Sequence, residues 1–255
     1  MFIGGQRSFW FNVFTDVAQM HGGHDPNTPN FLVQIAHFAI GSGMNAGSRD
    51  VEISLLWLRA FGVSAIHVPR QTPDDYYVAF ANPHKFEGVL PVLWREDGET
   101  IYRVPRQSDS LAHVVPASAL ATRRPVNGID VDPLVPYVSA LEDPAMPLAE
   151  MDWHGLNAFA VHTSAHRGQV ISVQTNYFPG WRAKVDGSER PVYADALGLM
   201  AVAPRCNGPC NVELTYDGGA ERRAALVASW LVTLPTIGFG LLSAARWRRY
   251  KTRLP

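Results

Sequence analysis

The stretch from Asn176 to Gly187 reads Asn-Tyr-Phe-Pro-Gly-Trp-Arg-Ala-Lys-Val-Asp-Gly. Its Pro179-Gly180 pair indicates a turn, because proline presets φ at one corner and glycine accepts a positive φ at the next. The last two residues, Asp186-Gly187, indicate a second tight turn. One short strand fits between the two turns.

The residues between the turns alternate strictly between apolar and polar side chains. The apolar set is Trp181, Ala183 and Val185, and the polar set is Arg182, Lys184 and Asp186. A period of two is typical of a strand with one buried face and one wet face. Upstream, the β-branched run 170–175 predicts a strand on the other side of the Pro-Gly turn. The stretch therefore describes one corner of an antiparallel β domain. The residues to which we assign structural roles are Pro179, Gly180, Trp181, Asp186 and Gly187.

The C-terminal half repeats these strand signals about every ten residues. The predicted strands are Asn157–Thr163, Gln169–Thr175, Trp181–Asp186, Pro191–Ala194, Gly198–Ala203 and Asn211–Tyr216. Short strands at this spacing, separated by turns, favour an antiparallel β-sandwich. We predict a jelly-roll-like sandwich over residues 151–220.

The N-terminal part mixes helix and strand signals. Residues 50–61 predict an amphipathic helix with Asp50 as its N-cap and Gly62 as its end. A buried strand from Val63 to Val68 follows. This order of elements is typical of an α+β unit.

Two more strand signals, 89–94 and 100–104, flank Glu96-Asp97-Gly98-Glu99, which indicates a hairpin. A strand over 111–115 is expected to close the unit, so residues 1–116 are interpreted as one α+β unit. Residues 117–150 contain several prolines and no steady apolar period. Such a segment indicates a connector that wraps two domains together.

The second decisive stretch is Ala224–Ala245, which has 22 residues and no charge. As a helix it spans about 33 Å, against a hydrocarbon core of about 30 Å. Its Pro235, Gly238 and Gly240 are tolerated in membrane helices. We therefore predict a C-terminal transmembrane helix over 224–245; the alternative is a buried core helix.

The charges on the two sides of this stretch differ. The basic residues of the tail, 246–255, are Arg246, Arg248, Arg249, Lys251 and Arg253. Only Arg222 and Arg223 precede the stretch, beside Glu221. The positive-inside rule then places the tail in the cytoplasm and everything before Ala224 outside it. No signal peptide precedes these domains, so further membrane helices are expected upstream, in the same polypeptide or a neighbouring gene.

Composition and motifs exclude several classes of function. The formal net charge of −1 argues against a nucleic-acid partner, which requires a basic stripe. The chain lacks a P-loop and the Gly-x-Ser-x-Gly, Gly-x-Gly-x-x-Gly and His-Glu-x-x-His motifs. We therefore assign no catalytic residue and no cofactor, and an independent enzyme is the disfavoured interpretation.

The two cysteines, Cys206 and Cys210, bracket Asn-Gly-Pro. Without further ligands beside them, a structural zinc site is not indicated. The favoured interpretation is a disulfide that closes a hairpin loop in an oxidising compartment and contributes about 2 kcal/mol. Two free thiols in a cytoplasmic loop remain the alternative.

Two groups of histidines are candidate metal ligands. The first, His21 and His24 with Asp25, lies in a glycine-rich loop, and the second, His162 and His166, lacks an evident third ligand. Solvated histidines are the favoured interpretation of both groups, so no metal is assigned.

Three segments carry a resemblance to a known family. They are Tyr-Phe-Pro-Gly-Trp-x-Ala-x-Val-Asp-Gly at 177–187, Val-Glu-Leu-Thr-Tyr at 212–216 and the helix–Gly–strand unit Leu56–Val68. In this order, before a membrane helix, they resemble the C-terminal extracytoplasmic region of YfhO-like bacterial membrane proteins, which are related to GT-C-type glycosyltransferases. The match runs from about Arg7 to the basic tail. It implies that a multi-helix module in the plasma membrane comes first and holds the catalytic carboxylates, none of which falls in this chain.

The resemblance implies a non-catalytic part of a membrane protein in envelope glycan assembly. The implied partners are the lipid bilayer, the upstream module and a glycan or lipid-linked sugar. The alternative is a stand-alone membrane-anchored carbohydrate-binding module. Candidate ligand-binding residues are Trp153, Asn157, Tyr177 and Arg182. Trp181 is an aromatic of the kind that stacks on sugars, but its alternation with Ala183 and Val185 favours a place in the core.

Overall fold

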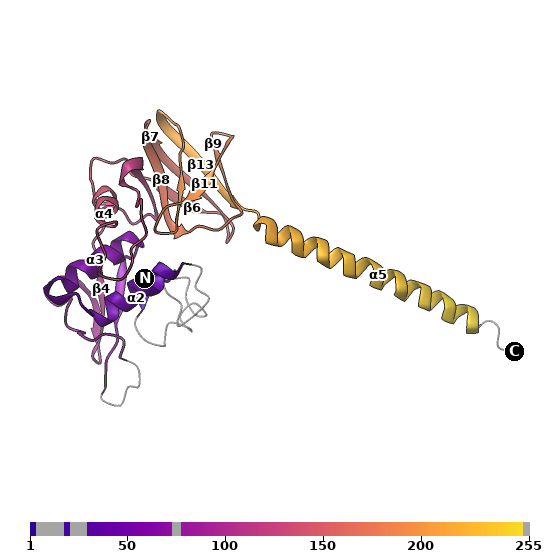
Figure 1. Ribbon diagram of the computed structural model, residues 1–255, viewed down its shortest axis with the longest axis horizontal. Coiled ribbons are helices and arrows are strands. Elements are labelled where there is room, and N and C mark those ends of the chain that lie inside the picture. The colour runs from indigo at the N-terminus through magenta and orange to yellow at the C-terminus, as the bar shows by residue number, and fades with distance from the viewer. Residues whose placement is uncertain (4–17, 21–29, 73–77, 252–255) are drawn as a thin grey trace.

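The computed structural model describes residues 1–3, 18–20, 30–72 and 78–251 (Figure 1). The loop with His21, His24 and Asp25 lies outside the described residues. The helical elements are α2 (Phe31–Ser42), η1 (Gly47–Arg49), α3 (Asp50–Ala60), η2 (Ala117–Ala119), α4 (Val135–Leu141) and α5 (Gly219–Lys251). The strands are β1 (Phe2–Ile3), β2 (Ala65–Val68), β3 (Val92–Glu96), β4 (Glu99–Arg103), β5 (Ala112–Pro116), β6 (Glu150–Trp153), β7 (Ala158–Ala165), β8 (Gln169–Asn176), β9 (Trp181–Val185), β10 (Ser188–Arg190), β11 (Val192–Ala194), β12 (Leu199–Val202) and β13 (Gly208–Tyr216). Among the described residues these strands form three sheets, antiparallel except for the β1–β2 pair.

The first sheet has the strand order β1-β2-β4-β3 and belongs to the N-terminal unit. Buried side chains of α2, α3, β2 and β4 share one core cluster, which includes Ile40, Trp57, Ile66 and Tyr102. The predicted mixture of helix and strand is therefore confirmed for this part of the chain.

The helix expected over 50–61 forms, but Asp50 is not its cap. Asp50 is the first residue of α3, and Arg49 stands at the N-cap position without a side-chain cap bond. The carboxylate of Asp50 contacts Lys85 instead, as described below. The predicted end is correct: Gly62 has a φ of 69°, and the Val63 N–H donates to the Leu58 carbonyl at 2.9 Å.

The hairpin expected around Glu96-Asp97-Gly98-Glu99 is also present. Strands β3 and β4 pair with Glu96 opposite Glu99, so the loop has two residues. Asp97 and Gly98 both have positive φ, 49° and 82°. A two-residue loop of this type requires positive φ at both positions and prefers Asp-Gly, which explains why this dipeptide stands here.

Strand β5, which was expected to close the N-terminal unit, belongs to the C-terminal β region instead. It pairs antiparallel with β8 in the sheet β11-β12-β8-β5. Val115 of β5 packs in the first core cluster, whereas Ala112 and Val114 pack in a second one. Because successive side chains of β5 are buried on both of its faces, the strand shows no alternation that would assign it to one unit.

The five-stranded sheet has the order β10-β9-β13-β7-β6, and its buried side chains share the second core cluster with those of the β11-β12-β8-β5 sheet. All six strands predicted from the sequence are present, within two or three residues at their ends. Strands β6 and β10 were not predicted. Strand β6 is mostly exposed and β10 has three residues, so neither carries a strong pattern.

The segment 117–150 is ordered and packs into the first core cluster. It contains α4, whose Tyr137, Val138 and Leu141 are buried there. The Tyr137 hydroxyl and the Ser172 hydroxyl of β8 are 2.8 Å apart. The Gly128 carbonyl accepts a hydrogen bond of 2.7 Å from the Trp57 indole of α3.

A buried polar cluster joins the N-terminal unit to the C-terminal sheets. Gln174 of β8 donates to the carbonyls of Arg59 and Ala60 at the end of α3, at 2.7 and 3.0 Å. Arg106 donates to the Gly62 carbonyl at 2.9 Å and to the Gln174 side chain at 2.8 Å. These bonds satisfy helix-end carbonyls that lack intrahelical partners. Burial, followed by the charge of Arg106, lowers the pKa of the adjoining His113 to about 4.

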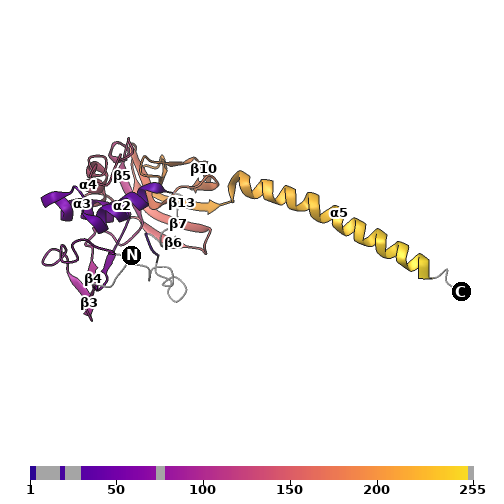
Figure 2. The same cartoon turned by 60° about the horizontal axis from the view of Figure 1, so that its bottom comes forward.

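Helix α5 continues directly from β13 and projects away from the rest of the molecule (Figures 1 and 2). Among the described residues, Gly219–Gly240 is long and apolar enough to cross a membrane, and its most apolar 18-residue window has a mean hydropathy of 1.2. None of that window is buried against the protein. The helix extends beyond the predicted span 224–245 at both ends.

Candidate functional site

Three segments meet where α5 begins, and we call this region the α5 end of the C-terminal sheets. They are the β6–β7 loop (154–157), the turn 177–180 and residues 217–219. The Tyr216 N–H donates to the Asn157 carbonyl at 2.8 Å, and the Asp217 N–H donates to the Gly180 carbonyl at 2.9 Å. Strands β7, β9 and β13 thus fix all three segments against the start of the helix.

Gly180 is required by this close approach. Its φ is 132°, and a Cβ at this position would lie 2.6 Å from the Gly219 nitrogen. The Pro179-Gly180 turn predicted from the sequence therefore does two things. It carries the chain from β8 in one sheet to β9 in the other, and it leaves room for α5 to start.

Four aromatic side chains form a continuous row at the α5 end, and we call it the aromatic row. The ring centroids of Trp153 and Phe159 are 4.9 Å apart, those of Phe159 and Trp181 are 5.3 Å apart, and those of Trp181 and Tyr216 are 5.5 Å apart. Phe159 is fully buried, and Trp181 is partly buried against the second core cluster. Trp181 thus contacts the core beside the Pro-Gly turn; its structural role stays a prediction.

Three of the four candidate ligand-binding residues lie at this end. Trp153 belongs to the aromatic row, Asn157 is exposed in the β6–β7 loop, and Arg182 donates to the Asp217 carboxylate at 3.3 Å. Asp217 also accepts from Arg223 of α5 at 3.1 Å. The sequence does not predict that these residues lie at the same end, because they are far apart in the chain and come together only through the pairing of β13 with β7 and β9.

The fourth candidate, Tyr177, lines a small polar pocket of about 230 Å³. Asn30, Arg124 and Asp195 contribute the other polar side chains. One carboxylate oxygen of Asp195, Oδ1, accepts from the N–H groups of Leu197 and Leu199, both at 2.9 Å. The other oxygen, Oδ2, is buried and has no hydrogen-bond partner among the described residues.

Asp195 was not predicted as a site residue. Burial raises its pKa to about 6, against the opposing effect of the backbone N–H donors. A buried acceptor without a partner is costly to the folded state unless a ligand or water satisfies it. The Asp-Ala-Leu-Gly sequence indicates only a turn in which the aspartate side chain accepts from nearby backbone N–H groups. Nothing in the sequence indicates that the second carboxylate oxygen is left without a partner.

We expect Asp195→Asn to stabilise the protein at pH 7 by about 2–3 kcal/mol. Folding raises the pKa of Asp195 from 3.8 to about 6. The protonated carboxyl therefore favours the folded state below pH 4, and this contribution is lost as the pH rises through 6. Asparagine keeps the Oδ1 acceptor without the charge. Denaturant unfolding of both proteins at pH 4 and pH 7 should show a difference only at the higher pH; an equal difference at both would contradict this account.

An open apolar groove of about 830 Å³ runs along α2. Its exposed apolar side chains are Phe31, Phe38, Met44, Val78, Val126 and Ile129. The groove offers area for an apolar partner. It was not predicted, because the helical pattern of α2 indicates only an apolar face and not what covers it.

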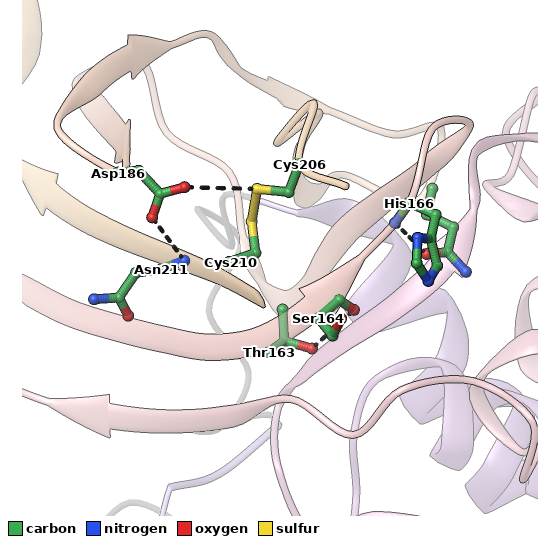
Figure 3. Close-up of a disulfide and its surroundings, with 8 residues drawn as sticks. Thr163, Ser164, His166, Asp186, Cys206, Cys210 and Asn211 are labelled. Carbon is green, nitrogen blue, oxygen red and sulfur yellow. Dashed lines mark hydrogen bonds between the residues drawn. A yellow bond between two sulfur atoms is a disulfide. The ribbon is translucent and has the colours of Figure 1, made fainter. Parts of the chain in front are cut away.

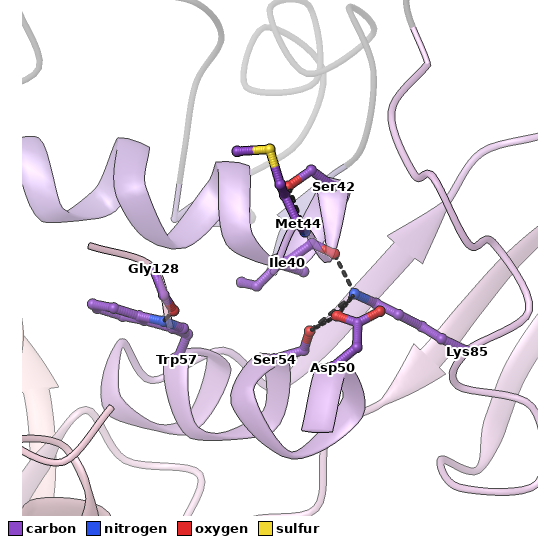
Figure 4. A network of polar contacts seen from close by, with 8 residues as sticks. All are labelled: Ile40, Ser42, Met44, Asp50, Ser54, Trp57, Lys85 and Gly128. Carbon is purple, nitrogen blue, oxygen red and sulfur yellow. Dashed lines mark hydrogen bonds and ion pairs between the residues drawn. The ribbon is translucent and has the colours of Figure 1, made fainter. Parts of the chain in front are cut away.

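Lys85 lies at the centre of a buried polar network beneath the C-terminal end of α2 (Figure 4). Its Nζ donates to the Ile40 carbonyl, to Asp50 Oδ1 at 2.8 Å and to Ser54 Oγ at 3.0 Å. Burial lowers the pKa of Lys85, and the hydrogen bond and charge of Asp50 oppose this. With its three donors used, the lysine holds α2 and α3 together, which is a structural role.

The disulfide between Cys206 and Cys210 is confirmed, with a Cα–Cα distance of 5.9 Å (Figure 3). The sequence predicts that this bridge closes a hairpin loop, and that prediction is wrong. The bridged segment connects β12 to β13, which belong to different sheets. Beside it, Asp186-Gly187 forms the predicted two-residue turn, with Ser188 opposite Val185, and the Asn211 N–H donates to Asp186 at 3.3 Å.

Replacing both cysteines with serine is expected to lower the free energy of unfolding by about 2 kcal/mol. The bridge closes a loop with a sequence separation of 4 residues, so it restricts only a short part of the unfolded chain. Denaturant unfolding with and without reductant gives the measurement. Reductant should destabilise the natural chain and leave the double variant unchanged; equal stability of the two proteins without reductant would contradict the expectation.

The described residues contain no group of three or more His, Cys, Asp or Glu side chains that could hold a metal ion. His162 lies 3.7 Å from the Asp152 carboxylate, and His166 lies 3.2 Å from the Asn207 side chain. The two histidines therefore have different neighbours and do not share a site.

In comparisons with known proteins, no family model, no curated protein and no solved structure matches this chain.

Proposed function

We propose that this chain is the non-catalytic, extracytoplasmic C-terminal portion of a polytopic bacterial membrane protein, held in the plasma membrane by α5. The observation that carries the proposal is the exposed apolar surface of that helix. The large apolar side chains that it exposes are Leu226, Val227, Trp230, Leu231, Val232, Leu234, Ile237 and Phe239. They surround the helix instead of forming one face. A helix that is apolar all round is stable when it is buried in a protein or a membrane, and no part of the described protein covers this one.

The length of α5 agrees with a bilayer. The 22 residues of Gly219–Gly240 span about 33 Å as a helix, close to the hydrocarbon thickness. The basic residues after Ala245 favour a cytoplasmic C-terminus by the positive-inside rule. The disulfide supports the opposite location for the domains before the helix, because disulfides persist in oxidising compartments.

For the domains themselves, we propose that the two C-terminal sheets form a jelly-roll-like β-sandwich that packs on the α+β unit. The resemblance to YfhO-like proteins supports a place after a multi-helix module related to GT-C glycosyltransferases. In that arrangement the chain acts in envelope glycan assembly by shaping the surface to which an acceptor or lipid-linked sugar is presented. The catalytic carboxylates belong to the upstream module.

The anchor is tested by washing membranes from cells that produce the full chain with alkaline carbonate. We expect the chain to stay in the membrane pellet. A variant with Leu231→Arg and Leu234→Arg places two charges at exposed positions of α5, at a cost of about 2.5–3.5 kcal/mol each at a bilayer centre. It should move to the supernatant. Release of the natural chain by carbonate, or its solubility without detergent, would overturn the proposal.

The polar pocket favours a second candidate function, a membrane-anchored carbohydrate-binding module. Its volume is below the range of about 300–1,000 Å³ for drug-sized ligands, so it suits a single sugar ring. Asp195, whose buried Oδ2 has no partner among the described residues, lines this pocket together with Tyr177 and offers an acceptor for a hydroxyl. Titration of the full chain in detergent with monosaccharides should then show binding that Asp195→Ala removes and Asp186→Ala retains. Absence of any binding would exclude this candidate and leave the first untouched.

A further inference from the structure

The α5 end of the C-terminal sheets exposes three large apolar side chains around the point where the helix leaves. Leu156 is 94% exposed, Trp153 is 49% exposed and Phe178 is 38% exposed. Leu156 and Phe178 lie on the two segments that are hydrogen-bonded to the residues just before α5. Exposed apolar side chains that gather in one place indicate a contact surface.

The backbone fixes how close this surface lies to the helix. Phe178 lies two residues before Gly180. A Cβ atom added at Gly180 would lie 2.6 Å from the backbone nitrogen of Gly219, which is the first residue of α5. Leu156 precedes Asn157, whose carbonyl accepts from Tyr216, three residues before that start. If α5 enters a bilayer at its first turns, these side chains lie next to the lipid headgroups, because their segments are hydrogen-bonded to the residues just before the helix.

The chemistry of the surface suits that region. Aromatic side chains prefer the boundary between headgroups and acyl chains, where the ring meets an apolar phase and its polar edge stays wet. Trp153 is the exposed end of the aromatic row, and the row continues through Phe159 and Trp181 to Tyr216. Trp153, at the surface, is therefore connected through ring contacts to the buried core of the domain.

Basic side chains stand next to the apolar ones. Arg182 and Arg223 are more than half exposed and share the Asp217 carboxylate, and Arg222 donates to the Asp217 carbonyl at 3.4 Å. Three guanidinium groups stand with the carboxylates of Asp217 and Glu221, the latter in the first turn of α5, and leave one net positive charge where the helix begins. Such charge attracts anionic lipid headgroups by about 1 kcal/mol for each basic residue.

We propose that Trp153, Leu156 and Phe178 insert into the lipid headgroup region, so that the α5 end of the C-terminal sheets rests on the outer surface of the bilayer. This rests on the proposed function, because it takes α5 to be membrane-spanning. The occupant of the surface is the lipid itself. The domain is then held at a fixed height and orientation above the membrane instead of swinging on a single helix.

The test uses the full chain in vesicles of phosphatidylethanolamine and phosphatidylglycerol. The described cysteines are both in the disulfide, so one introduced cysteine carries a nitroxide label without competition. Three variants are compared: Leu156→Cys on the proposed surface, Arg167→Cys in the β7–β8 turn at the opposite end of the strands, and Leu231→Cys in α5. Leu156 is almost fully exposed, so its replacement leaves the packing of the fold unchanged.

The measured quantity is the ratio of label collisions with oxygen, which dissolves in lipid, to collisions with a water-soluble nickel chelate. We expect the ratio at Leu156 to exceed that at Arg167 several-fold and to approach that at Leu231. A lipid-like ratio at Leu231 with a water-like ratio at Leu156 would overturn the proposed lipid contact and leave the anchor intact. A water-like ratio at Leu231 would overturn the anchor, and with it this inference.

Discussion

Replacing Lys85 with methionine is expected to lower the free energy of unfolding by about 3–5 kcal/mol. The lysine side chain is only 2% exposed, and its ammonium binds Asp50, Ser54 and the Ile40 carbonyl. Methionine fills a similar volume but leaves the Asp50 carboxylate without its cation and the Ile40 carbonyl without a donor. Removing one partner of a buried pair leaves an uncompensated charge, which costs far more than the pair contributes.

Two further variants separate this cause from a general loss of packing. Adding Asp50→Asn to the methionine variant should recover part of the lost stability, because the uncompensated charge is then gone. Arg95→Met is the matched surface control, since Arg95 pairs with Glu87 at 3.4 Å in an exposed position. It should cost no more than about 1 kcal/mol. A Lys85→Met loss as small as that of Arg95→Met would contradict the account of the network.

Trp181→Ala is expected to cost about 3 kcal/mol, the lower end of the range for aromatic truncation in a core. The indole is partly buried and contacts both Phe159 and Tyr216, so its removal opens the middle of the aromatic row. The loss should appear as a lower melting temperature of the C-terminal sheets. Trp94 of β3 is 43% exposed and serves as the control; Trp94→Ala should change the melting temperature little.

The same variant separates a core residue from a sugar-binding one. If Trp181 stacked on a glycan, its removal would leave melting unchanged and lower the affinity for the glycan. Unchanged melting of Trp181→Ala, measured beside a glycan titration of the full chain, is therefore the outcome that would contradict the structural role.

Local patterns predicted the elements that depend on local physics. The alternation after Trp181, the Asp-Gly turns at 97–98 and 186–187 and the helix end at Gly62 each follow from backbone preference or from one buried face. All of them are present. Strand β5 was assigned to the wrong unit, because its two faces pack in different cores and sequence gives no sign of that.

The candidate sites depend on contacts between distant segments, so less of them was predictable. Trp153, Asn157 and Arg182 were proposed separately, and only β13 and its hydrogen bonds show that they share one end. Asp50 was expected to cap α3, but Lys85, which is 35 residues away, binds its carboxylate instead. Asp195 had no sequence signal beyond a turn, because the lack of a partner for its Oδ2 is a property of the packed structure.

The central claim is that α5 crosses the plasma membrane and that the domains before it lie outside the cytoplasm. The most direct test is labelling of intact cells of the natural host with a maleimide that does not cross membranes. Val126→Cys places a thiol in the segment 117–150, ahead of α5, at a side chain that is 78% exposed, and a cysteine added after Pro255 marks the tail. We expect the thiol at position 126 to be labelled in intact cells and the tail thiol only after lysis. Labelling of the tail in intact cells, or of position 126 only after lysis, would contradict the account.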